Sequence, residues 1–175
     1  MTDRSETFAR VLKLEPGRTA LLVVDMQRGF LDPGEAMEVP PAREIVPRIR
    51  VLLDCFRAKR LPVVFTEFVY SESAPLLVGA LHPEHRPAPG ELVVRKRGYD
   101  GFAGTPLDGA LRARGVTSLV VTGTMTDICV LATVIGALHR EYRVTVVEDG
   151  VATLWPEIQR ATLDSGSTSV GTGSR

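Results

Sequence analysis

The sequence predicts an α/β fold in which a mainly parallel sheet carries helices on both faces. Five short runs rich in β-branched residues recur along the chain, and segments with helical spacing of apolar residues separate most of them. The runs at 19–25 (TALLVVD) and 117–123 (TSLVVTG) are continuously apolar, which is typical of strands covered on both sides. Alternation of strands with helices then favours parallel pairing.

The expected elements follow one another without an internal repeat or a linker, so we expect one domain over residues 1–175. The segments expected as strands are 19–25, 62–66, 91–96, 117–123 and 143–149. The segments expected as helices are 42–59, a stretch from Thr105 to near Gly115, 127–142 and 156–163. The segments expected as irregular are the loops 26–41 and 67–90, an N-terminal arm over 1–18 and a flexible tail over 166–175.

Composition excludes several classes of protein. Lys and Arg together number 21, as do Asp and Glu, so the formal net charge is zero and nucleic-acid binding is not expected. No apolar run reaches the length of a membrane span. Two cysteines and a polar beginning without a secretory signal lead us to expect a reducing cytoplasm.

Three chemically complementary residues follow expected strands. Asp25 ends the first strand, Lys96 ends the third, and Cys129 begins the helix after the fourth. Ligands of parallel sheets bind beyond the carboxyl ends of the strands, so these side chains should converge. We expect the helix N-terminus and the ammonium to favour the thiolate, and Asp25 to exchange protons with it. The backbone N–H groups of Met125 and Cys129 are expected to hold an oxyanion.

Each of these residues also has a purely structural interpretation. Cys129 alone would be read as a small buried hydrophobe, Asp25 as a turn residue, and Lys96 as one of three solvated charges. Their convergence favours catalysis. For Cys55, which lies within a helix beside Leu53 and Phe56, we expect burial. A redox pairing of Cys55 with Cys129 remains a third hypothesis, although the chain has no Cys-x-x-Cys motif.

Four motifs in the same order resemble isochorismatase-like cysteine hydrolases, over residues 19 to about 164. They are LLVVDMQRGFLDPG, Lys96 with RGYDGFAGTPLDGAL, LVVTGTMTDICVLATVIGAL and VTVVEDGVAT. The resemblance implies a Rossmann-like three-layer sandwich of five or six strands and an Asp25–Lys96–Cys129 triad. It also implies a non-proline cis peptide at Thr124-Met125 and a homo-oligomer, either dimer or tetramer.

Departures from the family narrow the expected function. Nicotinamidases carry an Asp-x-His metal motif and a further histidine after the second strand, where this chain has TEFVYSES. We place His82 and His85 in a surface loop and expect neither a metal nor another cofactor. Isochorismatases generally lack the nucleophilic cysteine. The family usually ends with another helix and an edge strand, for which TSVGTGSR is a poor candidate.

The expected function is therefore hydrolysis of a C–N bond in a small amide, ureido or carbamoyl substrate through a thioester. The alternatives are a vinyl-ether hydrolase of the isochorismatase type and a non-catalytic small-molecule-binding domain. Six residues near the catalytic edge are expected to line the substrate pocket, with ordinary packing as the alternative for each: Gln27, Phe30, Phe68, Tyr99, Phe102 and Thr126.

Overall fold

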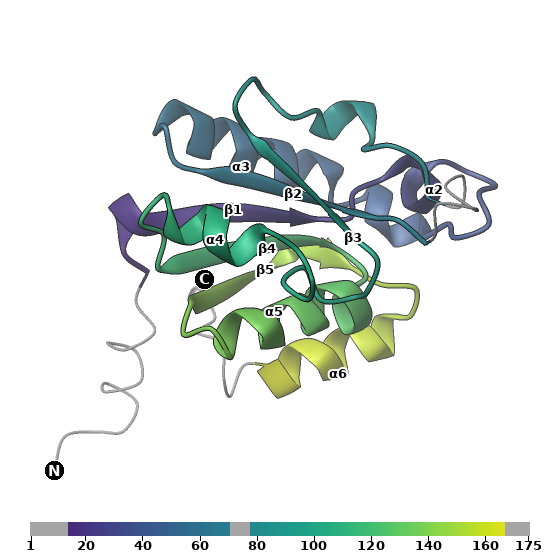
Figure 1. Ribbon diagram of the computed structural model, residues 1–175. Helices are drawn as coiled ribbons and strands as arrows, with labels where there is room; N and C mark the ends of the chain where they lie inside the picture. Colours follow the sequence, from purple (N-terminus) through teal and green to yellow (C-terminus); the bar gives the residue numbers. More distant parts are fainter. Residues whose placement is uncertain (1–13, 71–77, 167–175) are drawn as a thin grey trace, which may run out of the picture.

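One five-stranded parallel sheet organises the computed structural model, which describes residues 14–70 and 78–166. The strand order is β3-β2-β1-β4-β5, and every neighbouring pair is parallel (Figure 1). The predicted α/β fold is confirmed, with five strands. Their bounds are β1 (Thr19–Val24), β2 (Val63–Phe68), β3 (Leu92–Lys96), β4 (Ser118–Thr124) and β5 (Arg143–Ala152).

The helices follow the predicted order with four short additions. The longer helices are α3 (Val46–Ala58), α4 (Leu107–Arg112), α5 (Leu131–Leu138) and α6 (Pro156–Gly166). The shorter turns are η1 (Pro16–Arg18), α2 (Arg28–Leu31), η2 (Pro40–Arg43), η4 (Pro83–His85) and η5 (Thr126–Val130). The segments 26–41 and 67–90, expected as loops, thus contain α2, η4 and the start of η2, and the expected N-terminal arm contains η1.

The helix expected over 127–142 differs most from the prediction. It opens with the π-helical turn η5, and α5 ends at Leu138. The end has a physical cause, since Glu141 adopts a φ of 66° and the Tyr142 N–H returns to the Ala137 carbonyl at 3.1 Å. This closing turn reverses the chain into β5 before the helix can continue.

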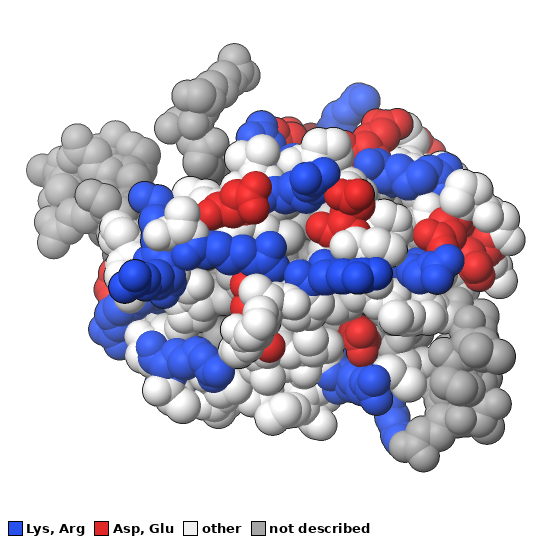
Figure 2. Space-filling view, turned by 90° about the horizontal axis from the view of Figure 1, so that it is seen from above, with Lys and Arg blue, Asp and Glu red and all other residues white. Residues whose placement is uncertain are grey.

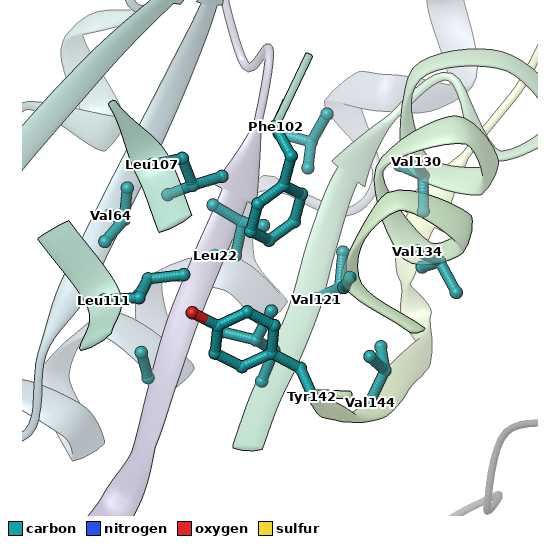
Figure 3. Packing of buried hydrophobic residues seen from close by; sticks show 14 of the residues in the cluster. Leu22, Val64, Phe102, Leu107, Leu111, Val121, Val130, Val134, Tyr142 and Val144 are labelled. Carbon is teal, nitrogen blue, oxygen red and sulfur yellow. The ribbon is translucent and has the colours of Figure 1, made fainter. Parts of the chain in front are cut away.

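The two faces of the sheet carry separate hydrophobic clusters because successive side chains of a strand point to opposite sides. Leu21 and Val23 of β1 face α3 in one cluster, whereas Leu22 and Val24 belong to the other. Figure 3 shows this second cluster, in which residues of α4 and α5 pack over Leu22 and Val121. Each fully buried aliphatic side chain contributes on the order of 1.5–3 kcal/mol.

Most of the expected arm and tail, residues 1–13 and 167–175, lies outside the described residues. The described end of the arm is tied to the sheet, because the Glu15 carboxylate accepts hydrogen bonds from Arg143 and from Thr117. The question of an added edge strand at the C-terminus also falls outside the description. Among the described residues, no helix has the length and apolarity to cross a bilayer.

Candidate active site

The three predicted catalytic residues meet where the strand order reverses. β1 and β4 are neighbours, while successive connections lead outward from them on both sides. Asp25 directly follows β1, and Cys129 lies in η5, directly after β4. Parallel sheets bind ligands at such a switch point, beyond the carboxyl ends of the strands. The positions of Asp25 and Cys129 therefore follow from the order of the strands in the sheet.

Asp25 and Lys96 form a fully buried ion pair. The Lys96 Nζ atom lies 2.7 Å from Asp25 Oδ2, and both side chains have 0% exposure. β3 is separated from β1 by β2, a distance of about 10 Å at the usual strand spacing. A cation that starts on β3 needs a long side chain to reach Asp25, and lysine supplies one.

The Lys96 ammonium is held by two further contacts. Nζ donates to the Gly98 carbonyl at 3.1 Å and lies 5.1 Å from the centroid of the Phe68 ring. Phe68 in turn stacks with Tyr99 at 6.1 Å between ring centroids. The ammonium is therefore fixed between a carboxylate, a carbonyl and an aromatic face, which together stabilise its charge.

Asp25 adopts an unusual backbone conformation that Thr66 supports. Its φ is 50°, in the left-handed region, where aspartate is one of the few non-glycine residues found regularly. The Asp25 N–H donates to Thr66 Oγ1 at 3.2 Å, and that hydroxyl donates to Asp25 Oδ1 at 2.6 Å. Sequence reasoning missed Thr66, because a threonine within a strand is an ordinary β-former.

Cys129 is buried, with 5% exposure, and close to both charged groups. Burial raises the pKa of the Cys129 thiol to about 12, and the Asp25 carboxylate adds to this, whereas Lys96 opposes it. Lys96 favours the thiolate, as expected, but its effect on the pKa is smaller than that of burial. Desolvation outweighs the nearby ammonium, so the resting side chain is a thiol and needs a base.

The backbone beside Cys129 offers a hydrogen-bond donor. The Thr124-Met125 peptide bond is cis, as the resemblance implied. The N–H of Met125 donates no backbone hydrogen bond to any of the residues that the structure describes. The Thr153 hydroxyl donates to the Asp127 carboxylate, which ties the start of η5 to the end of β5. The turn η5 is thus fixed in place, and the Met125 N–H directly before it is available to a ligand.

The central strands approach each other closely next to Asp25. Gly123 has a φ of 119°, and a Cβ atom there would lie 2.0 Å from the Val24 carbonyl oxygen. Only glycine fits this backbone and this spacing. Val24 and Gly123 are also register partners, so the residue that precedes Asp25 packs directly on β4.

The residues predicted to line the pocket have different environments. The Gln27 amide donates to the Phe68 and Gly79 carbonyls, and its oxygen accepts from the Phe68 N–H. Phe30 and Phe102 are buried in the clusters on opposite faces of the sheet. Gln27, Phe30 and Phe102 thus have packing or bridging contacts of their own.

Two predicted pocket residues have groups that could meet a ligand. Tyr99 is 58% exposed, and its loop is tied to α5, because Gly101 N–H donates to Thr133 Oγ1 at 2.9 Å. Thr126 is buried, and its hydroxyl has no partner among the described residues. Phe68 lies between Lys96 and Tyr99, so it connects the exposed Tyr99 ring to the buried ion pair.

Two residues outside the site differ from expectation. His85 is fully buried, so its assignment to a surface loop is wrong, because η4 packs against α3. Cys55, expected to be buried, is exposed on α3. Across residues 14–70 and 78–166, no three His, Cys, Asp or Glu side chains gather as metal ligands would.

Comparison with known proteins identifies the family. The family model described as the isochorismatase domain matches residues 19–172. Ureidoacrylate amidohydrolase RutB of Methylobacterium radiotolerans is 32% identical over an alignment 195 positions long, which covers 87% of this chain and 74% of that protein.

Solved structures agree with this assignment. A cysteine hydrolase from Pseudomonas syringae pv. phaseolicola has a TM-score of 0.84 and 28% identity, over 91% of this chain and 89% of that one. N-carbamoylsarcosine amidase from Thermoplasma acidophilum has a TM-score of 0.75 and 33% identity, over 89% and 94% of the two chains. The chain therefore belongs to the isochorismatase family.

Proposed function

We propose that Cys129 is the nucleophile, Asp25 the proton carrier and Lys96 the electrostatic partner of a C–N hydrolase. The chain is a hydrolase of C–N bonds other than peptide bonds, like the amidohydrolases to which it is similar. The observation that carries the assignment of roles is the fully buried Asp25–Lys96 pair at 2.7 Å beside the Cys129 thiol. Burying two charges is costly, and functional sites are where such pairs concentrate.

The first half-reaction forms a thioester. Cys129 Sγ attacks the substrate carbonyl carbon while its proton passes to Asp25, because the resting group is a thiol. The N–H groups of Met125 and Cys129 hold the resulting oxyanion. The C–N bond then breaks, Asp25 returns the proton to the leaving nitrogen, and ammonia or an amine departs.

The second half-reaction releases the acid. Asp25 accepts a proton from a water molecule, and the hydroxide that forms attacks the thioester carbonyl. The C–S bond breaks, the sulfur regains its proton, and a carboxylic or carbamic acid leaves. Lys96 keeps its charge throughout, so that Asp25 alternates between its two protonation states beside a constant positive partner.

Ureido and carbamoyl compounds are the substrate class that we propose first, followed by simple carboxamides. Two of the similar proteins are named for ureidoacrylate and N-carbamoylsarcosine, both of which contain such a group. Nicotinamidase activity is less well supported, since the segment after β2 lacks the Asp-x-His motif. Vinyl-ether hydrolysis is the second candidate, and the placement of Cys129 beside a base argues against it.

The test is ammonia release from a panel of ureido, carbamoyl and carboxamide compounds. Wild type, Cys129→Ala and Cys55→Ala are assayed together, because Cys55 is exposed and outside the site. We expect release by wild type and Cys55→Ala and none by Cys129→Ala. Release by Cys129→Ala at the wild-type rate would contradict the proposed role. If the panel yields no ammonia while a vinyl ether is cleaved, the second candidate replaces the first.

We also propose that the chain acts in the cytoplasm as a homo-oligomer, a dimer or tetramer. A reducing compartment suits a thiol nucleophile. Within the described residues β5 pairs only with β4, so the sheet has an open edge that a second copy could cover. The molar mass in solution, measured by light scattering, tests this. A value near the 19.0 kDa of one chain would contradict it.

A further inference from the structure

We infer that Thr66 is a positioning residue that selects Asp25 Oδ2 as the oxygen that exchanges protons with Cys129. The inference rests on the proposed function, since it assigns a role beside the same nucleophile. A carboxylate has two equivalent oxygens, and only a contact outside the Asp25 side chain can make them different. Lys96 lies against Oδ2, and Thr66 supplies the contact with Oδ1 from the neighbouring strand, β2.

The hydrogen bonds of Thr66 fix the direction of its hydroxyl proton. Thr66 Oγ1 accepts from the Asp25 N–H at 3.2 Å, so its own proton is free to point at Asp25 Oδ1, 2.6 Å away. Oδ1 is thereby occupied by a donor. Oδ2 has Lys96 Nζ at 2.7 Å and no hydroxyl donor within the described residues, which leaves it available to the thiol.

The location of Thr66 makes this selection rigid. It is the register partner of Val24, the residue before Asp25, and it has 0% exposure. Its β-branched side chain is stiff about χ1. A single hydroxyl therefore holds both the backbone of Asp25, in a left-handed conformation of φ 50°, and its carboxylate. Rotation of the carboxylate would break the hydrogen bond between two side chains that are both fully buried.

Removing only the hydroxyl should damage chemistry more than binding. Thr66→Val keeps the volume and leaves the Asp25 N–H and Oδ1 without a partner, so the carboxylate can turn away from the thiol. Misplacement of a catalytic group commonly costs on the order of 100-fold in rate. Thr66→Ser keeps the hydroxyl. Thr122→Val is the matched control, since Thr122 is equally buried on β4 and its hydroxyl lies 3.5 Å from the Leu22 carbonyl.

The experiment has a readout that needs no substrate. In a Cys55→Ala background, the rate of Cys129 alkylation by iodoacetamide is measured from pH 5 to 9 for all four proteins. The thiol is protonated over this range, so alkylation depends on Asp25 as base, with Lys96 as its other charged neighbour. We expect Thr66→Val to slow alkylation and to shift its acid limb to higher pH, because the carboxylate loses a donor. Thr66→Ser and Thr122→Val should follow the parent.

Steady-state kinetics complete the test once a substrate is known. We expect Thr66→Val to lower kcat by roughly 10- to 100-fold with KM little changed, and Thr66→Ser to restore most of the loss. A Thr66→Val protein with the parent pH profile, or one that falls together with Thr122→Val, overturns the inference. Failure of the proposed function would instead appear as turnover that survives Cys129→Ala, while the alkylation profiles still report on Thr66.

Discussion

Within residues 14–70 and 78–166, titratable side chains are completely buried in two places, and the two places differ in how they offset the cost of burying a charge. At the switch point of the sheet, Asp25 and Lys96 are paired at 2.7 Å with 0% exposure. Under α3, His85 is also fully buried, yet neither ring nitrogen has a hydrogen-bond partner among the described residues. Burial lowers the pKa of His85 to about 4, and the nearby Val46 backbone opposes this only in part.

The comparison shows that burial of a titratable side chain does not by itself mark a functional site. His85 avoids the cost of burying a charge because it stays neutral, and the packing around it is sufficient to keep it neutral. Asp25 and Lys96 have Thr66, Gly98 and Phe68 arranged around them. Polar and aromatic partners that stabilise charged side chains inside the protein are a stronger indication of a functional site than burial alone.

The largest effect is expected from breaking the buried pair. Lys96→Met leaves the Asp25 carboxylate uncompensated, so we expect activity to be lost and the free energy of unfolding to fall by about 3–5 kcal/mol. Urea denaturation at pH 7 measures the fall. The double variant Asp25→Asn/Lys96→Met buries no charge, and asparagine tolerates the left-handed conformation. It should regain most of the stability and none of the activity. Equal stability of wild type and Lys96→Met would contradict the account.

A smaller effect is expected from the pH dependence of His85. Its pKa is about 4 when folded against a usual 6.5, so the unfolded chain binds the proton more tightly. Stability is then complete above pH 6.5 and is lost as the pH falls toward 4, by on the order of 2 kcal/mol between pH 7 and 5. Denaturation curves at the two pH values should show this for wild type and for His139→Gln, an exposed control. His85→Phe should lose this pH dependence of stability. If the pH dependence is unchanged in His85→Phe, another titratable group causes it.

The smallest effect is expected on the surface next to His85. Arg50 and Glu84 pair at 2.8 Å, with side chains 60% and 45% exposed. On the face viewed in Figure 2, basic and acidic side chains lie beside one another in this manner. Solvent screens such pairs, so Arg50→Ala should change the free energy of unfolding by less than about 1 kcal/mol, and salt should reduce the difference further. A loss as large as that of Lys96→Met would remove the distinction between buried and exposed pairs.

The strands of the sheet could be predicted from the sequence because the pattern of a buried parallel strand, a short apolar run, is local in the chain. The run predicted at 117–123 is the strand Ser118–Thr124, and the run at 91–96 is Leu92–Lys96. Strand ends then placed Asp25, Lys96 and Cys129 at one edge, since parallel strands share their direction. The convergence of the ion pair with the thiol therefore followed from chain order alone.

What the sequence could not predict depends on contacts between distant segments. Thr66 looks like any strand threonine until its register with Val24 is known. His85 lies in a segment with four prolines, and these predict a surface loop. It is the packing of η4 on α3 that buries His85. The balance at Cys129 depends on how deeply the fold buries the thiol, which the sequence does not show; the helix start and the lysine, taken alone, favour the thiolate.

The most direct test of the central claim is to find the covalent intermediate. Wild-type protein is mixed with a turned-over ureido or amide substrate, quenched in acid within one turnover, and digested for mass spectrometry. We predict an acyl group on the peptide that contains Cys129 and none on the peptide that contains Cys55, the exposed internal control. Steady consumption of substrate with Cys129 unmodified at every quench time, and with turnover retained in Cys129→Ser, would contradict the thioester mechanism.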